Sequence, residues 1–232
     1  MLNFEKINSE IACPNETTIA QAQAHWDGIA KPLNGLGQFE KIITKIAGLT
    51  GSSRVSIRKR AVVVFCADNG VVAEGVTQTD ASVTATMAGQ IRDHRSSVCL
   101  MTASAGADVL AKLGGFDIAG MVGLFLGGAI YRIPVLVDGL ISSFSALIAA
   151  RLCPNCRCAM LASHTSAEPA AAKIPDELEL TAILHAGMKL CEGTGAVCMM
   201  PLLDMALSVY HGSAAFADTG IAQYQKLGGE ST

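Results

Sequence analysis

The segment Ala61-Val-Val-Val-Phe-Cys66 decides the fold, because it is an unbroken run of apolar residues with high strand propensity. Polar residues do not alternate within it, so we expect a strand that is buried on both faces of a parallel sheet. The segment Ala67-Asp68-Asn69-Gly70 follows directly. Open α/β sheets bind their ligands outside the carboxyl ends of the strands. Asp68 is therefore expected to orient a ligand or a neighbouring loop, or else to cap its own loop.

Two later segments repeat this pattern of a buried strand followed by polar residues. Ile133-Pro-Val-Leu-Val137 leads into Asp138 and Gly139, and Cys158-Ala-Met-Leu-Ala162 leads into Ser163-His-Thr-Ser-Ala-Glu-Pro169. Helical segments lie between the three expected strands. The sequence therefore predicts an α/β fold with a doubly wound, Rossmann-like parallel sheet, whose polar strand ends gather along one edge.

Most of the remaining chain has the periodicity of helices. Residues 16–49 are expected to form helices on either side of a break at 31–37, with Thr17 or Thr18 as the first cap. Lys31 in this break would meet an anion or be solvated. The other expected helices are one from about 83 and those at 96–111, 118–131, 142–152, 180–190 and 201–210. We expect no strand before Gly114-Gly115, so this pair is not a dinucleotide fingerprint.

Composition narrows the class of protein. Hydrophobic residues make up 50% of the 232 residues and charged residues 16%, so the chain can bury a large core and an oligomer interface. The net charge of -3 gives no reason to expect a nucleic acid or a membrane as partner. The most apolar run, 118–137, is interrupted by Arg132 and Pro134, and the N-terminal residues do not resemble a signal peptide. We therefore expect a cytoplasmic protein.

Two further patterns could indicate a zinc site or a hydrolytic triad, but neither has the residues that such a site needs. Cys153, Cys156 and Cys158 lack a second paired element, so a loop of reduced thiols is expected and a zinc site is the alternative. Ser163, His164 and Asp138 could suggest a hydrolytic triad, but the chain has no Gly-x-Ser-x-Gly elbow. His164 is therefore expected to be a hydrogen-bonding loop residue. No metal and no cofactor are expected.

The best candidate for chemistry is Glu192, which is followed by Gly193-Thr194-Gly195 and flanked by apolar residues. The glycines permit a tight turn and a close approach of the backbone to a ligand. If a helix begins near Ala196, its free N–H groups and the Thr194 hydroxyl could hold a phosphate or carboxylate. A partly desolvated Glu192 would then act as a general base. The alternative is a solvated surface turn.

Several of these segments, in this order, resemble nicotinate-nucleotide–dimethylbenzimidazole phosphoribosyltransferases. The resemblance rests on segments 25–37, 61–76, 112–120 and 132–139, together with Ser163–Pro169 and Glu192–Gly195. It implies an α/β core over residues 51–200 and a smaller helical part formed by residues 1–50 and 201–232. It also implies a homodimer and an enzyme that needs no metal.

The resemblance further implies a reaction and roles for individual residues. The phosphoribosyl group of nicotinate mononucleotide would move to 5,6-dimethylbenzimidazole or a related base, giving α-ribazole 5′-phosphate and nicotinate for cobamide assembly. Glu192 matches the general base of the family. The nucleotide would be held by Asp138, Ser166, Gly193, Thr194 and Gly195, and the base would lie at Gln78, Thr79, Asp80, Ser82 and Val83.

The chain also departs from the family's pattern. Asn69 stands where histidine is common, and Gln78, Thr79 and Asp80 replace an aromatic-proline pair. A long section that carries a Gly-Glu-Met-Gly-Ile-Gly-Asn-Thr-Thr motif in the family is missing between Val109 and Leu110. Two alternatives to catalysis therefore stay open: a non-catalytic member that binds a base or nucleotide, and a thiol or metal-binding protein.

Overall fold

The computed structural model describes residues 3–67, 71–75, 78–105, 108–113, 117–171 and 174–225. The chain divides into two compact units. One contains Met1–Ala12 and Ile57–Pro201, and the other contains Cys13–Ser56 and Leu202–Thr232. In the described part of the chain, no helix combines the length and the apolar character needed to cross a bilayer.

The described residues of the first unit contain two pairs of parallel strands. β1 (Ala61–Cys66) pairs with β2 (Asp108–Leu113), with Ala61 opposite Asp108 and Cys66 opposite Leu113. β3 (Val135–Val137) pairs with β4 (Met160–Ala162), with Val137 opposite Ala162. Among the described residues the strands thus form two pairs rather than one continuous sheet. The expected fold class, with parallel strands flanked by helices, is confirmed.

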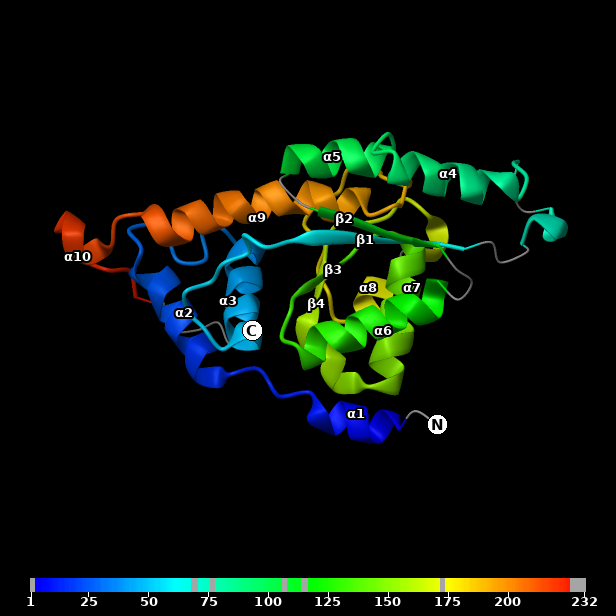
Figure 1. Ribbon diagram of the computed structural model, residues 1–232. Coiled ribbons are helices and arrows are strands. Elements are labelled where there is room, and N and C mark those ends of the chain that lie inside the picture. The colour runs from blue at the N-terminus through cyan, green and yellow to red at the C-terminus, as the bar shows by residue number, and fades with distance from the viewer. Residues whose placement is uncertain are drawn as a thin grey trace. The chain divides into compact units, whose positions relative to one another are not determined.

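Helices cover both faces of β1 and β2 (Figure 1). Val62 and Val64 belong to one buried cluster with side chains from α4, α5 and the first turns of α9. Phe65 points to the other face, where it packs so closely on Gly120 of α6 that a Cβ at this glycine would lie 2.6 Å from the ring. The helices and turns of this unit are α1 (Phe4–Glu10), η1 (Val71–Glu74), α4 (Ser82–Arg92), α5 (Ser97–Ala105), α6 (Asp117–Ile130), α7 (Leu140–Leu152), η2 (Pro154–Ala159), η3 (Pro169–Ala171), α8 (Ile174–Glu177) and the first part of α9 (Thr194–Gly212).

The second unit consists of α2 (Glu16–Gly28), α3 (Gln38–Thr50), the rest of α9 and α10 (Phe216–Thr219). Trp26 is fully buried and lies 4.8 Å from the ring of Tyr210, edge to face. Lys31 meets an anion within the chain, as one of the two expectations had it, because its Nζ lies 2.7 Å from the buried Glu40 carboxylate. The first cap is Asn15, whose side chain accepts the Thr18 N–H, so the prediction of a threonine cap was wrong.

Three further predictions need correction. Residues 96–111 are not one helix, because α5 ends at Ala105 and β2 begins at Asp108. β2 also ends directly before the double glycine at 114–115, which itself lies outside the described residues, so the prediction that no strand precedes it was wrong. Alanine and leucine favour a helix here, but pairing with β1 outweighs this weak local preference.

The segment 180–190 is extended rather than helical. The Thr165 N–H donates to Leu184 O at 2.9 Å, and the Ala167 N–H donates to Met188 O at 3.0 Å. The segment therefore runs beside the residues that follow β4, which satisfies its backbone polar groups without a helix. Glu192 is thus delivered to its position by strand-like pairing.

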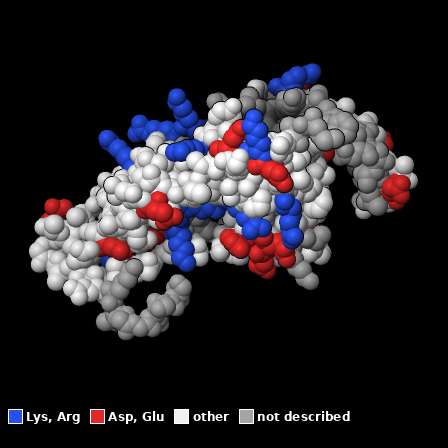
Figure 2. All heavy atoms as spheres, turned by 90° about the horizontal axis from the view of Figure 1, so that it is seen from below, with Lys and Arg blue, Asp and Glu red and all other residues white. Residues whose placement is uncertain are grey.

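Surface charge is sparse and mixed. On the face shown in Figure 2, Lys and Arg side chains occur together with Asp and Glu, and much of the surface carries no charged residue. This agrees with the charged fraction of 16% and the net charge of -3.

Candidate active site

A strained turn precedes α9 in the first unit. Cys191, Glu192 and Gly193 have consecutive positive φ angles of 64°, 59° and 84°. For the two residues with a side chain this conformation costs roughly 1–3 kcal/mol each, so it persists only where the surroundings hold it. Position 193 requires glycine for a second reason, because a Cβ there would lie 2.7 Å from Cγ1 of Val62 in β1. The turn is therefore fixed against β1.

Asp138, at the carboxyl end of β3, holds this turn. Its Oδ2 accepts the Gly193 N–H at 2.9 Å, and its Oδ1 accepts the Ala196 N–H at 2.8 Å. A carboxylate at the first turn of a helix is stabilised by the orphan N–H groups and by the helix dipole. Two of the N–H groups that the sequence suggested for an anionic ligand are thus already occupied by Asp138.

Thr194 and Ser142 complete this local network. The Thr194 hydroxyl donates to Cys191 O at 2.8 Å, and the side chain is 1% exposed. The Asp138 N–H donates to Ser142 Oγ at 2.8 Å, which ties the end of β3 to the first turn of α7. The Thr194 hydroxyl therefore stabilises the turn from inside the protein.

His164 follows β4 and packs against the start of α9. Its Nδ1 lies 3.0 Å from Ser163 Oγ and 3.9 Å from Asp138 Oδ1. Because Ser163 Oγ already donates to Val137 O at 2.6 Å, its oxygen is left to accept the Nδ1–H of the imidazole. His164 is a hydrogen-bonding loop residue, as the sequence predicted.

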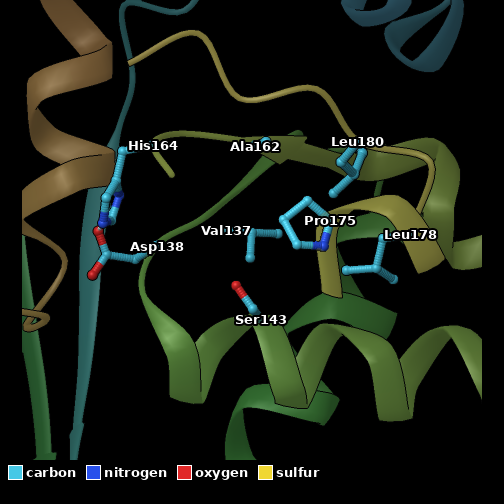
Figure 3. Close-up of a pocket in the computed structure, with 8 residues that line it drawn as sticks. All are labelled: Val137, Asp138, Ser143, Ala162, His164, Pro175, Leu178 and Leu180. Carbon is cyan, nitrogen blue, oxygen red and sulfur yellow. Dashed lines mark ion pairs between the residues drawn. The ribbon is translucent and has the colours of Figure 1, made fainter. Parts of the chain in front are cut away.

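A small pocket opens beside Asp138 and His164 (Figure 3). In this view the two side chains point toward each other next to α9, while Ser143 and the apolar side chains lie around the other end of the pocket. Its lining residues come from β3, α7, β4, α8 and the loop after α8: Val137, Asp138, Ser143, Ala162, His164, Pro175, Leu178 and Leu180. The pocket is thus placed at the carboxyl ends of the second strand pair.

Glu192 is half-buried, and none of the described residues forms a hydrogen bond or an ion pair with its carboxylate. Burial raises the pKa of this carboxyl above its ordinary value. The Cys66 thiol at the end of β1 also has a raised pKa, through its own burial and through the charge of Glu192. Glu192 thus directly precedes the glycine that packs on Val62 of β1, and its lack of a hydrogen-bond or ion-pair partner among the described residues suits a base.

Ser166 lies in the loop after β4 and contacts a second carboxylate. Its hydroxyl donates to Glu168 Oε2 at 3.1 Å, and the Cys191 thiol lies 3.9 Å from the same oxygen. Sequence reasoning missed Glu168, Cys191 and Cys66. Glu168 belongs to the Ser163–Pro169 motif and Cys191 adjoins Glu192 in the sequence. Only the fold brings the side chains of Glu168 and Cys191 into contact.

The residues expected to hold the base lie at the start of α4. Gln78, Thr79 and Asp80 are exposed, and Val83 is 38% exposed. The Asp80 carboxylate accepts the Ser82 N–H and hydroxyl, and these hydrogen bonds lower the pKa of Asp80. Asp80 thus binds the first residue of α4, and the side chains of this segment are accessible. Asp68 lies outside the described residues.

Gly195 provides a test of this packing. A Cβ at this position would overlap the His164 ring, which has no room to move because it is buried. We expect Gly195→Ala to lower the free energy of unfolding by about 2 kcal/mol, as overpacking in a core does. The control is Gly123→Ala in α6, where a Cβ meets nothing within 4 Å and alanine should be neutral or stabilising. Equal urea midpoints for the two variants would contradict the packing described here.

Known proteins match this chain along nearly its whole length. A family model described as phosphoribosyltransferase matches residues 11–109 and 103–221. The nicotinate-nucleotide–dimethylbenzimidazole phosphoribosyltransferase of Ruminiclostridium cellulolyticum is 27% identical, with 97% of this chain and 100% of the relative covered. The enzyme of the same name from Dehalococcoides mccartyi is 43% identical over 118 residues, which cover 51% of this chain and 34% of the relative.

A solved structure shares the fold. The crystal structure of CobT from Thermus thermophilus superimposes with a TM-score of 0.84 at 20% identity, covering 90% of this chain and 100% of the other. With the sequence matches, this defines the class of the protein, which is an enzyme that transfers a pentosyl group. The chain belongs to the phosphoribosyltransferase family whose model matches residues 11–109 and 103–221.

The matches also show that this chain is internally short. The alignment with the Ruminiclostridium cellulolyticum relative has 351 positions and this chain has 232 residues, so at least 119 positions face a gap here. The two parts of the family model overlap at residues 103–109, which include the end of α5 and the first two residues of β2. In the structure, β2 thus begins within this junction and pairs with β1.

Proposed function

We propose that this chain transfers the phosphoribosyl group of nicotinate mononucleotide to 5,6-dimethylbenzimidazole or a related base. The products would be α-ribazole 5′-phosphate and nicotinate, for the lower ligand of cobamides. The proposal is supported by the names of the relatives and by one observation in particular. Glu192 offers a half-buried carboxylate of raised pKa, without a partner among the described residues, in the turn that packs on β1 through Gly193.

The chemistry of the reaction suits a single carboxylate base. The bond between C1′ of the ribose and the nicotinate nitrogen breaks, and its electron pair neutralises the cationic pyridinium ring, so this leaving group needs no acid. One ring nitrogen of the incoming base forms the new bond to C1′, while the N–H proton of the base passes to Glu192. A carboxylate also stabilises the oxocarbenium-like sugar electrostatically.

The other assigned residues fall into two groups in this proposal. Asp138 and Thr194 hold the Glu192 turn, because their polar atoms are engaged with the backbone. The remaining residues are proposed to contact substrate. Ser166, Gly193 and Gly195 would contact the nucleotide, Gln78, Thr79, Asp80, Ser82 and Val83 would contact the base, and Asp68 would orient a substrate. We also propose that the enzyme acts as a cytoplasmic homodimer, which its apolar composition and the exposed Tyr131 and Ile133 support.

The decisive experiment is incubation of the purified chain with nicotinate mononucleotide and 5,6-dimethylbenzimidazole, followed by measurement of nicotinate release and product mass. We expect equal amounts of nicotinate and α-ribazole 5′-phosphate. Absence of product, with both substrates still bound in equilibrium dialysis, would contradict the proposed reaction. It would mean that the shortened chain binds the substrates without completing the transfer.

The pH dependence of turnover follows from the raised pKa of Glu192. Glu192 can accept a proton only when its carboxyl is deprotonated, so turnover should fall as the pH decreases through the pKa of Glu192. Because burial raises that pKa, the fall should begin at a higher pH than for an ordinary carboxyl, whose pKa is about 4.3. The measurement is kcat from pH 4 to 8 at saturating substrates, with protonation of the free base followed separately by its absorbance. A kcat that stays constant down to pH 4 would contradict the role of Glu192.

A further inference from the structure

The Cys191 side chain occupies a confined place between the end of β3 and the loop after β4. A Cβ on Gly139 would lie 2.9 Å from Cys191 Sγ, so the sulfur packs directly on this glycine. The Cys191 thiol also donates to Glu168 Oε2, with an Sγ to oxygen distance of 3.9 Å. The thiol thus packs on the residue before α7 and acts as a weak donor to a carboxylate.

The electrostatic surroundings keep this thiol neutral. Burial and the charges of Glu168 and Asp138 raise the pKa of Cys191 to about 11. At neutral pH the group therefore retains its S–H, which can donate to Glu168. A negative charge at this position would be repelled by both carboxylates.

Cys191 and Glu192 are adjacent in the strained turn. The contacts that hold the Cys191 side chain therefore also influence the direction in which the Glu192 side chain points. Thr194 and Asp138 bind the backbone of the turn, through Cys191 O and the N–H groups of Gly193 and Ala196. The Cys191 side chain adds its own contacts, with Gly139 and Glu168, at the first residue of the turn. Glu192, by contrast, has no hydrogen-bond or ion-pair partner among the described residues.

We propose that Cys191 is a positioning residue, whose thiol fixes the turn between Gly139 and Glu168 so that the neighbouring Glu192 stays half-buried. This role rests on the proposed function of Glu192 as the base. It assigns to Cys191 no contact with substrate. A hydroxyl can replace the thiol as a donor, whereas a methyl group cannot.

The test compares Cys191→Ala and Cys191→Ser with Cys198→Ala, a half-buried thiol in α9 that serves as the matched control. In Cys191→Ala we expect kcat to fall about tenfold with KM within about twofold, because the base is misplaced while substrate contacts remain. The acidic limb of the kcat profile should shift to lower pH as Glu192 becomes more solvated. Cys191→Ser should recover most of kcat, and Cys198→Ala should match the unmodified chain.

A second readout separates this proposal from the proposed reaction. The titration of Glu192 is followed by carbon-13 NMR of labelled glutamate carboxyls, with the spectrum of Glu192→Gln giving the assignment. Cys191→Ala should lower the pKa of Glu192, whether or not the chain transfers phosphoribosyl groups. Unchanged titration and kcat in Cys191→Ala would overturn the role of Cys191. Failure of the unmodified chain to form product, with the shift in Glu192 still present, would overturn the reaction alone.

Discussion

Replacing Glu192 with glutamine is expected to lower kcat by at least about 100-fold, which corresponds to about 2.7 kcal/mol of transition-state stabilisation. Glutamine keeps the size of the side chain but cannot accept the proton that the incoming base must lose. The binding of nicotinate mononucleotide should change little, because the proposed nucleotide contacts are made by other residues. The measurement is kcat and KM for both substrates, together with a dissociation constant for the nucleotide by calorimetry.

The control for this variant is Glu10→Gln in α1, which removes an exposed carboxylate of the same chemistry. Glu10→Gln should leave kcat unchanged. The residual activity of Glu192→Gln should also lack the acidic limb that the unmodified enzyme shows. Turnover within threefold of the unmodified chain would remove Glu192 from the mechanism.

Replacing Asp138 with alanine is expected to have the largest effect on stability, lowering the free energy of unfolding of the first unit by about 2–4 kcal/mol. The variant loses two hydrogen bonds to a charged acceptor, at 2.9 Å from Gly193 and 2.8 Å from Ala196. The N–H groups that remain lie at the start of α9, where the helix dipole favours a negative charge. Because the strained turn then loses its main restraint, kcat should fall as well.

The variant Asp138→Asn tests the two hydrogen bonds one at a time, because it can keep only one of them. Its amide oxygen can accept one N–H, but its NH₂ group opposes the other, so the loss of stability should be intermediate. Asp176→Ala in α8 is the control, since it removes an exposed aspartate with the same change of charge. Stability is measured by urea denaturation followed by circular dichroism. If Asp138→Ala and Asp176→Ala had the same urea midpoint, Asp138 would not be holding α9.

The two predictions with the largest effects thus give different roles to the carboxylates of Asp138 and Glu192. Asp138 engages both of its oxygens with the backbone of the turn, whereas Glu192 has no such partner among the described residues. Burial of an unpaired carboxylate raises its pKa. The fold therefore keeps one carboxylate as a fixed support and leaves the other available for proton transfer.

The shortened middle of the chain is also informative. The two halves of the family model overlap at residues 103–109, and the structure places β2, which begins within this junction, in register with β1. The parallel pair of β1 and β2 therefore forms even though the middle section is missing. The turn that carries Glu192, which packs on β1 through Gly193, is retained.

Much of this protein follows from its sequence alone, because the signals are local. The apolar run at 61–66 forms the predicted strand. Only the face with Val62 and Val64 is fully buried and the face with Val63 and Phe65 is half-buried, so the prediction of burial on both faces was only partly right. Local signals also predict α2 and α3, whose periodicity and break can be seen directly. Glu192 could be selected because a charge between apolar residues and a glycine turn is unusual.

The tertiary structure decided what depends on contacts between distant segments. Residues 108–113 and 180–190 have the composition of helices, yet each is extended because a neighbouring segment pairs with its backbone. Asp138 was expected to contact a ligand, but its oxygens bind N–H groups 55 and 58 residues further along the chain. Such partners carry no local signal, because residue spacing says nothing about which strand ends meet. The sequence thus determined the first strand and the candidate base, and the fold determined what holds that residue in place.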